Sequence, residues 1–205
     1  MRRKNRPFAL LTLPFLMLAC GGSDAADDAG SEMAETAAAP PAAASASGLS
    51  CNVMGDAEGR ASPLEELSFT YDGGEGLLCY GAPSANGREI MGGLVPFGQP
   101  WRLGANEPTT IHLSAATTIG GVSVEAGTYS IYAIPGESEW EFFVNTNADR
   151  WGIPINDEVR ATEIGSFRAS AESVADMVET MTFGHMGNAL SLSWENTRLD
   201  IPIGM

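Results

Sequence analysis

The stretch LSFTYDGGEGLLCY, residues 67 to 80, decides the fold class. Residues 67–71 and 76–80 are short runs rich in aromatic and aliphatic side chains, which favour extended strands. The DGGE between them supplies the glycines that a tight hairpin turn needs, because glycine adopts positive φ angles without steric cost. The stretch therefore predicts two antiparallel strands joined by a short turn.

Short strand-like runs separated by turn residues continue toward the C-terminus. TTIHLS, residues 109–114, alternates apolar and polar side chains, which predicts a strand with His112 on its polar face. Only residues 170–181 have a helical spacing, and we expect their second half to be extended. Further strand-like runs are VSV (122–124), TYSIYAIP (128–135), WEFFVN (140–145), EIGSFRAS (163–170), VETMTF (178–183), ALSLSWE (189–195) and RLDIPI (198–203). About ten short strands without interleaved helices predict an all-β fold, a single-domain antiparallel β-sandwich or barrel-like meander.

The first 48 residues have a different character. Basic residues precede the apolar run of residues 7–19, which is too short and too interrupted by proline to span a bilayer and is typical of an export signal. LMLACGG, residues 16–22, resembles the bacterial lipoprotein cleavage box, which implies cleavage before Cys20 and acylation of that cysteine; the alternative is a plain secretory signal. Residues 21–48 are small, acidic or proline residues with little to bury, which predicts a disordered tether. The expected organisation is a lipoprotein signal peptide (1–19), the acylated Cys20 with its tether (20–48) and a β-domain (49–205).

Export and anchoring predict where the protein resides. The anchor makes the membrane a partner and places the chain in the cell envelope. Gly21 and Gly22 occupy the positions where an aspartate often retains lipoproteins in the inner membrane, so the outer membrane is favoured if the host has two. Cys51 and Cys79 remain after the anchor cysteine, and in an exported protein they predict a disulfide.

Charge excludes several functions. The 11 Lys and Arg residues face 26 Asp and Glu residues, and loss of the four basic residues of the signal leaves 7, for a charge of −19. Such a chain repels phosphate backbones, so no nucleic-acid partner is expected. Lys4 is the sole lysine, which leaves the mature chain without a Schiff-base or P-loop lysine.

The candidate site lies in VPFGQPWRLGANE, residues 95–107, together with Arg88. Arg102 or Arg88 could form an internal clamp with Glu107, because the guanidinium fork matches a carboxylate. Alternatively, the two arginines could hold an anionic ligand. Trp101 could be a stacking platform or a core residue, whereas Trp140 and Trp194 are expected in the core. The ligand-binding candidates are Arg88, Trp101, Arg102, Asn106 and Glu107.

The sequence gives weaker evidence for catalysis than for ligand binding. Glu107 and His112 could form a general base with an arginine nearby, which would describe a hydrolase-like enzyme. No GxSxG element surrounds Ser84, and no HxH, HExxH or CxxC spacing is present, so neither a metal nor a cofactor is expected.

Three longer motifs carry a family resemblance. CYGAPSANGREIMGGLVPFGQPWRLGANEPTTIHLS, VSVEAGTYSIYAIPGESEWEFFVN and RWG together resemble the bacterial domain of unknown function family numbered 2911, over about residues 80–203. The resemblance implies an exported β-rich protein with no established activity. The matching positions are Tyr80, Pro83, Ser84, Gly87, Arg88, Trp101, Arg102, Gly104, Ala105, Asn106, Glu107, Thr110, Gly127, Thr128, Tyr129, Pro135, Gly136, Trp140, Asn145, Trp151 and Gly152. The departures are Ala82, where the family commonly has arginine, and RWGIPIND at residues 150–157, where the family usually has Gly and Tyr.

The expected function is a non-catalytic binding or interaction module of the cell envelope, with residues 80–107 as its contact surface. Carbohydrate, peptide and small anion are the ligand classes left open. The alternatives are the hydrolase-like enzyme above and a purely structural envelope protein.

Overall fold

The computed structural model describes residues 48–204. The predicted signal peptide, Cys20 and all of the tether except Gly48 lie outside the described residues. No helix among residues 48–204 is long and apolar enough to cross a bilayer.

A six-stranded antiparallel sheet forms the larger layer, with strand order β1-β2-β3-β6-β7-β8. Neighbouring strands follow one another along the chain, apart from one small excursion between β3 and β6. Short turns join β1 to β2 and β6 to β7, whereas longer connections join β2 to β3 and β7 to β8. The six strands are β1 (Leu64–Tyr71), β2 (Gly74–Gly81), β3 (Thr109–Leu113), β6 (Gly127–Ile134), β7 (Glu139–Asn145) and β8 (Glu163–Ser170). This is the meander that the sequence predicts.

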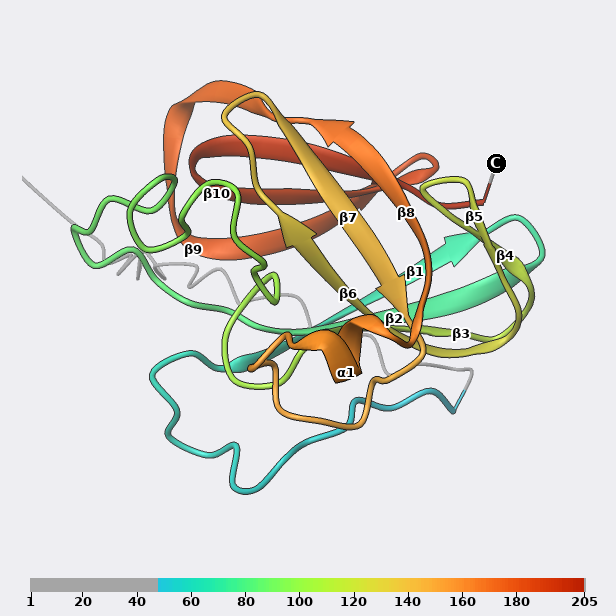
Figure 1. Cartoon of the computed structure of the whole chain (residues 1–205). Helices are drawn as coiled ribbons and strands as arrows, with labels where there is room; N and C mark the ends of the chain where they lie inside the picture. Colours follow the sequence, from blue (N-terminus) through green and yellow to red (C-terminus); the bar gives the residue numbers. More distant parts are fainter. Residues whose placement is uncertain (1–47, 205) are drawn as a thin grey trace, which may run out of the picture. The chain divides into compact units, whose positions relative to one another are not determined.

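A long hairpin of β9 (Glu172–Met186) and β10 (Ala189–Pro202) forms the second layer. Figure 1 shows it behind β6 and β7. A smaller hairpin, β4 (Thr117–Ile119) with β5 (Val122–Val124), is the excursion after β3. The main core contains residues of both layers, such as Ile131 and Phe142 from the larger sheet and Leu192 and Leu199 from β10. The domain is therefore an all-β sandwich, as predicted.

The quoted hairpin forms as predicted. Tyr71 pairs with Gly74 at the end of the β1–β2 ladder, so the turn has only two residues between the strands, Asp72 and Gly73. Gly73 has φ +94°, in the region that favours glycine.

Two predictions about the C-terminal third need correction. The run 170–181 has a helical spacing, but its first half is not helical, because residues from Glu172 onward belong to β9 and pair with β10. Its second half is extended, as predicted. The runs 189–195 and 198–203 are not separate strands, since β10 continues through Ala189–Pro202 with register shifts around Glu195. Glu195 itself has φ +54°, which fits a bulge.

The sequence patterns predicted neither the strand β4 nor a one-turn helix, α1 (Asp157–Arg160). Its N-cap is Asn156, whose side chain accepts a hydrogen bond from the Val159 amide at 3.1 Å. The helix lies in the connection between β7 and β8.

The second face of the larger sheet is also covered. Leu77, Cys79, His112, Tyr132 and Asn145 are buried but do not belong to the main core cluster. The disulfide Cys51–Cys79 attaches the segment 48–63 to this sheet, and Figure 1 shows that segment and α1 on the same side of β1, β2 and β3. Both faces of β3 are therefore shielded from solvent.

Candidate functional site

Residues 82–107 form a long connection between β2 and β3 that is fixed to both layers. The Met181 amide donates to the Pro83 carbonyl at 2.9 Å, which attaches the connection to β9. Trp101 and Ala133 exchange backbone hydrogen bonds of 2.7 and 2.9 Å, which attach it to β6. These bonds satisfy backbone groups that would otherwise be buried unpaired, so the connection is part of the folded framework.

Glu195 of β10 holds the middle of this connection. Its two carboxylate oxygens accept hydrogen bonds from the amides of Ile90 and Met91, both at 3.2 Å. The β10 bulge thus places a carboxylate where two backbone donors need an acceptor.

A cavity of about 250 Å³ opens between this connection and β10. It is lined by Ser62, Pro83, Arg88, Leu94, Trp101, Arg102, Gly104, Ala105 and Trp194. Two arginines are among these residues, and no aspartate or glutamate is. Three of the five predicted ligand-binding residues therefore meet at one cavity.

Arg102 is half-buried in this lining. Its Nε is buried without a hydrogen-bond partner, and no residue of 48–204 accepts a hydrogen bond from its guanidinium. Burial lowers the pKa of Arg102 below its usual value, because desolvation disfavours the charged form. Arginine nevertheless stays protonated at neutral pH, so a residue of the cavity lining is a cation that no carboxylate of residues 48–204 neutralises.

Gly152 allows this position of Arg102. A Cβ at Gly152 would overlap Arg102 Cδ and would lie 2.6 Å from the Asn106 carbonyl oxygen. The Gly152 amide donates to that same carbonyl at 2.9 Å. A glycine is required there because the backbone passes directly over the arginine stem.

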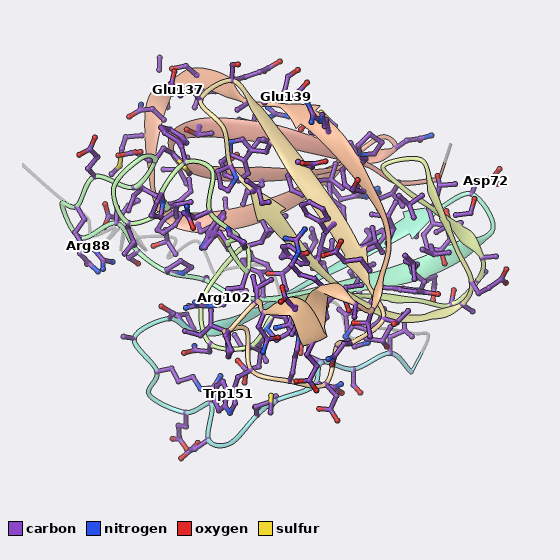
Figure 2. The ribbon with its side chains drawn as sticks, viewed as in Figure 1. Asp72, Arg88, Arg102, Glu137, Glu139 and Trp151 are labelled. Atoms are coloured by element: carbon purple, nitrogen blue, oxygen red, sulfur yellow. A yellow bond between two sulfur atoms is a disulfide. The ribbon has the colours of Figure 1, made fainter. Side chains whose placement is uncertain are left out.

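Arg88 lies further out on the same connection, as Figure 2 shows. Its Nε donates to the Ala85 carbonyl at 2.9 Å and one Nη to the Ser84 carbonyl at 2.7 Å. These bonds fix the exposed guanidinium without neutralising its charge.

The charge pattern of the arginines distinguishes this cavity. Within residues 48–204 there are seven arginines, and four of them lie within 4.0 Å of a carboxylate oxygen: Arg60, Arg160, Arg168 and Arg198. Arg88, Arg102 and Arg150 have no such partner in the described part, and the first two line the same cavity.

Trp101 combines the two roles that the sequence left open. Its ring stacks on Trp194 at a centroid distance of 5.9 Å and contacts the edge of Trp140 at 5.7 Å, while it also lines the cavity. Trp140 and Trp194 are core residues, each 1% exposed, as predicted. Trp151 is exposed and does not line the cavity.

Glu107 is clamped, but not by the predicted arginine. The Arg60 guanidinium donates to both oxygens of the Glu107 carboxylate, at 2.9 and 2.7 Å, and the Met54 amide donates to Oε1 at 2.8 Å. Pairing with Arg102 or Arg88 was therefore wrong. Arg60 lies outside the quoted motifs, between Gly59 and Ala61, so no local pattern marked it as the partner.

These contacts also set the charge state of Glu107. Burial by itself would raise the pKa of its carboxyl group, but the hydrogen bonds from the Met54 amide, Arg60 and its own amide, with the charge of Arg60, lower it below the usual 4.5. Glu107 is thus a buried carboxylate at neutral pH that holds the segment 48–63.

Asn106 acts on the same segment. It adopts φ +62°, a left-handed conformation that asparagine tolerates, and its Nδ2 donates to the Ser62 carbonyl at 3.1 Å. Neither Asn106 nor Glu107 lines the cavity, but the hydrogen bond of Asn106 supports the cavity wall at Ser62.

His112 is buried, which corrects its predicted place on a polar, solvent-facing side of the strand. Its ring nitrogens lie 3.1 Å from Thr110 Oγ1 and 2.9 Å from Thr128 Oγ1. Burial lowers the pKa of His112 below 6.5, since desolvation disfavours the imidazolium. Among the hydrogen bonds of the described residues, none joins His112 to Glu107.

The remaining predicted residues have structural partners. Ser84 Oγ lies 2.8 Å from Thr180 Oγ1, and Ser114 Oγ accepts the Glu75 amide at 2.8 Å. Cys51 and Cys79 form the predicted disulfide. In residues 48–204, no three side chains of His, Cys, Asp or Glu gather as a metal site.

The fold and cavity define the class: an antiparallel β-sandwich whose longest connection and second layer enclose a small cationic, tryptophan-lined cavity. The profile of the family described as "Protein of unknown function (DUF2911)" matches residues 62–203, and the chain belongs to that family. This match starts at residue 62, whereas the resemblance in the quoted motifs starts at about residue 80. No curated protein and no solved structure matches the chain.

Proposed function

We propose that this chain is an exported, lipid-anchored protein of the cell envelope whose β-domain binds a small anionic ligand without catalysis. The ligand occupies the cavity lined by Arg88, Trp101, Arg102 and Trp194, which we call the Arg–Trp pocket. The observation that carries the proposal is that Arg102, a residue of the pocket lining, has no carboxylate partner among residues 48–204, in a chain where acidic residues outnumber basic ones.

Electrostatics supports an anion as the ligand. A half-buried guanidinium with free donors gains most from a charge-assisted, two-point hydrogen bond with an oxyanion. No aspartate or glutamate lines the pocket, so Arg102 stays unneutralised there although acidic residues outnumber basic ones in the chain. Arg88 adds a second positive charge at the rim, so attraction is concentrated at this one place.

The contacts of the catalytic candidates favour the ligand-binding hypothesis over the hydrolase-like alternative. Glu107 and His112 are buried, and each makes its hydrogen bonds with other partners. A nucleophile and its base need to share a hydrogen bond and a path to substrate. The catalytic candidates therefore serve as framework residues in this proposal.

The binding proposal is tested with the full chain in lipid discs, titrated with acetate, inorganic phosphate and benzoate while tryptophan fluorescence is followed. We expect saturable binding of at least one anion, weakened about tenfold or more in Arg102→Gln, because a charged hydrogen bond contributes about 1.5–3 kcal/mol. Arg198→Gln is the control, since Arg198 is paired with Asp200 away from the pocket. Absence of any Arg102-dependent binding would refute the proposal.

The anchoring proposal has its own test. The basic n-region, the apolar run and the cysteine of LMLACGG support acylation at Cys20, and a disulfide in the domain fits an oxidising compartment. We expect wild-type cells to incorporate labelled palmitate into the protein and Cys20→Ala cells not to. Membrane fractionation would then place it in the outer membrane if the host has two; recovery in the inner membrane alone would contradict that placement.

A further inference from the structure

We infer that the ligand of the Arg–Trp pocket is a small amphiphilic monocarboxylate, whose carboxylate meets Arg102 and whose apolar part lies against Leu94 and the tryptophans. The inference rests on the proposed function and narrows its ligand from any small anion to one chemical class.

Part of the pocket lining is apolar. Leu94 lines the pocket and is 47% exposed, an unusual position for a leucine unless something covers it. Phe97, three residues on, is 39% exposed. The half-buried Trp101 adds ring surface to the same lining, and the buried Trp194 stacks on it. An apolar group of a ligand would therefore remove leucine and indole surface from water, while the negative charge of the same ligand binds Arg102.

Size limits that apolar group. The cavity of about 250 Å³ lies below the roughly 300–1,000 Å³ typical of drug-sized ligands. It has room for one ring or one branched aliphatic group, but a sugar chain or an extended peptide would lie mostly outside it. The ligand is accordingly a small molecule.

Charge decides between a carboxylate and a phosphate. Both oxyanions match the guanidinium fork. However, a phosphate monoester carries nearly two negative charges at neutral pH, and the excess of acidic over basic residues in the chain disfavours the second charge. Glu89 and Glu195 are immediate chain neighbours of the lining residues Arg88 and Trp194. A single negative charge is therefore preferred.

The pocket also excludes water from part of the contact. Arg102 Nε is already buried, and Trp194 is only 1% exposed, so a ligand that covers Leu94 would leave the guanidinium and the carboxylate in a medium of reduced dielectric. The apolar and charged contacts thus reinforce one another, which a small inorganic anion cannot achieve.

The test compares acetate, benzoate, cyclohexanecarboxylate and inorganic phosphate on the full chain in lipid discs, with empty discs as the blank. We expect the two ring carboxylates to bind at least tenfold more tightly than acetate, in line with burial of a ring, and phosphate to bind more weakly than benzoate. This comparison uses only the wild-type chain and does not depend on the folding of a variant.

A pair of variants locates the apolar contact. Leu94→Asn should weaken benzoate binding about fivefold or more and leave acetate binding unchanged, because acetate does not reach Leu94. Ile164→Asn is the matched control, since Ile164 is 45% exposed and does not line the pocket. We expect it to bind benzoate as the wild type does.

The outcomes separate the two proposals. Equal affinities for acetate, phosphate and benzoate, all lost in Arg102→Gln, would overturn the amphiphile inference and leave the anion-binding function standing. Tight benzoate binding that Leu94→Asn does not weaken would overturn it as well. Absence of Arg102-dependent binding for every anion would remove the proposed function itself.

Discussion

Glu107 shows how a single buried carboxylate organises its surroundings. It receives hydrogen bonds from the Arg60 guanidinium and the Met54 amide, and it comes from a connection of the sandwich that is distant from both in sequence. The side chains of Arg60 and Glu107 are 12% and 6% exposed, so removal of either partner would leave an uncompensated charge in a poorly hydrated place.

Glu107→Gln should therefore destabilise the domain by about 3 kcal/mol or more, because the amide cannot neutralise Arg60. Chemical denaturation at neutral pH measures this loss. The control is Glu139→Gln, which breaks an exposed pair with Arg168 and should cost less than about 1 kcal/mol. Equal effects of the two substitutions would contradict the role of Glu107 as a buried clamp. A double-mutant cycle with Arg60→Met would isolate the pair.

Glu107 and His112 make stability depend on pH in the same direction. Both have folded-state pKa values below their ordinary values of 4.5 and 6.5. The unfolded chain therefore binds more protons than the folded one between each lowered pKa and its ordinary value. The corresponding stability is present above that ordinary value and is lost as the pH falls through the folded-state pKa.

For His112, the expected result is a free energy of unfolding that decreases from pH 7.5 to pH 5, and a smaller decrease in His112→Gln. Thr110 and Thr128 are uncharged, so the effect comes from desolvation of the ring and not from an ion pair. Denaturant unfolding curves at half-unit pH steps measure it. An unchanged slope in the variant would mean that His112 is not the group responsible.

At the scale of the element, the connection between β2 and β3 has a fixed shape because other elements supply its hydrogen-bond partners. Its backbone bonds reach β6 and β9, and the carboxylate of Glu195 in β10 accepts the amides of Ile90 and Met91. The Arg88 and Leu94 positions of the pocket lie on either side of those two amides in sequence. The bulge of β10 thus helps to shape the pocket.

Glu195→Ala should accordingly increase amide hydrogen exchange at residues 90 and 91 by about tenfold, since each lost hydrogen bond to a carboxylate contributes about 1.5–3 kcal/mol locally. It should also weaken benzoate binding. Exchange in β7, which Glu195 does not contact through these bonds, serves as the internal control. Unchanged protection at residues 90 and 91 would show that other contacts hold the connection.

At the scale of the whole molecule, the segment 48–63 covers the second face of the larger sheet. It is held by the disulfide, by Arg60 with Glu107, and by Ser62 with Asn106. The same segment contributes Ser62 to the pocket. The chain that leads from the proposed membrane anchor is thus attached directly to the wall of the proposed binding site.

Removal of the disulfide in Cys51→Ala/Cys79→Ala should reduce the free energy of unfolding by about 3 kcal/mol, the chain-entropy value for a loop closed across 28 residues. The thermal midpoint, measured without reductant, reports the loss. Reductant should lower the midpoint of the wild type to that of the variant, and it should leave the variant unaffected. A wild-type midpoint insensitive to full reduction would contradict this stabilising role.

The sequence by itself determined most of the strands, the hairpin at Asp72 and Gly73, the disulfide and the burial of Trp140 and Trp194. These features depend on local alternation, on turn residues or on side chains so large and apolar that almost any sandwich buries them. They could be read from residues 49–205 without knowledge of which layer faces which.

Only the tertiary structure decided the partners. Arg60 pairs with Glu107 across 47 positions in the sequence, and His112 is buried because a distant segment covers its face of the sheet. Arg88, Arg102, Trp101 and Trp194 meet at one pocket because β10 packs beside a connection that precedes it by about ninety residues. Periodicity assigns a side chain to a face, but the element that covers that face is chosen by the packing of the whole chain.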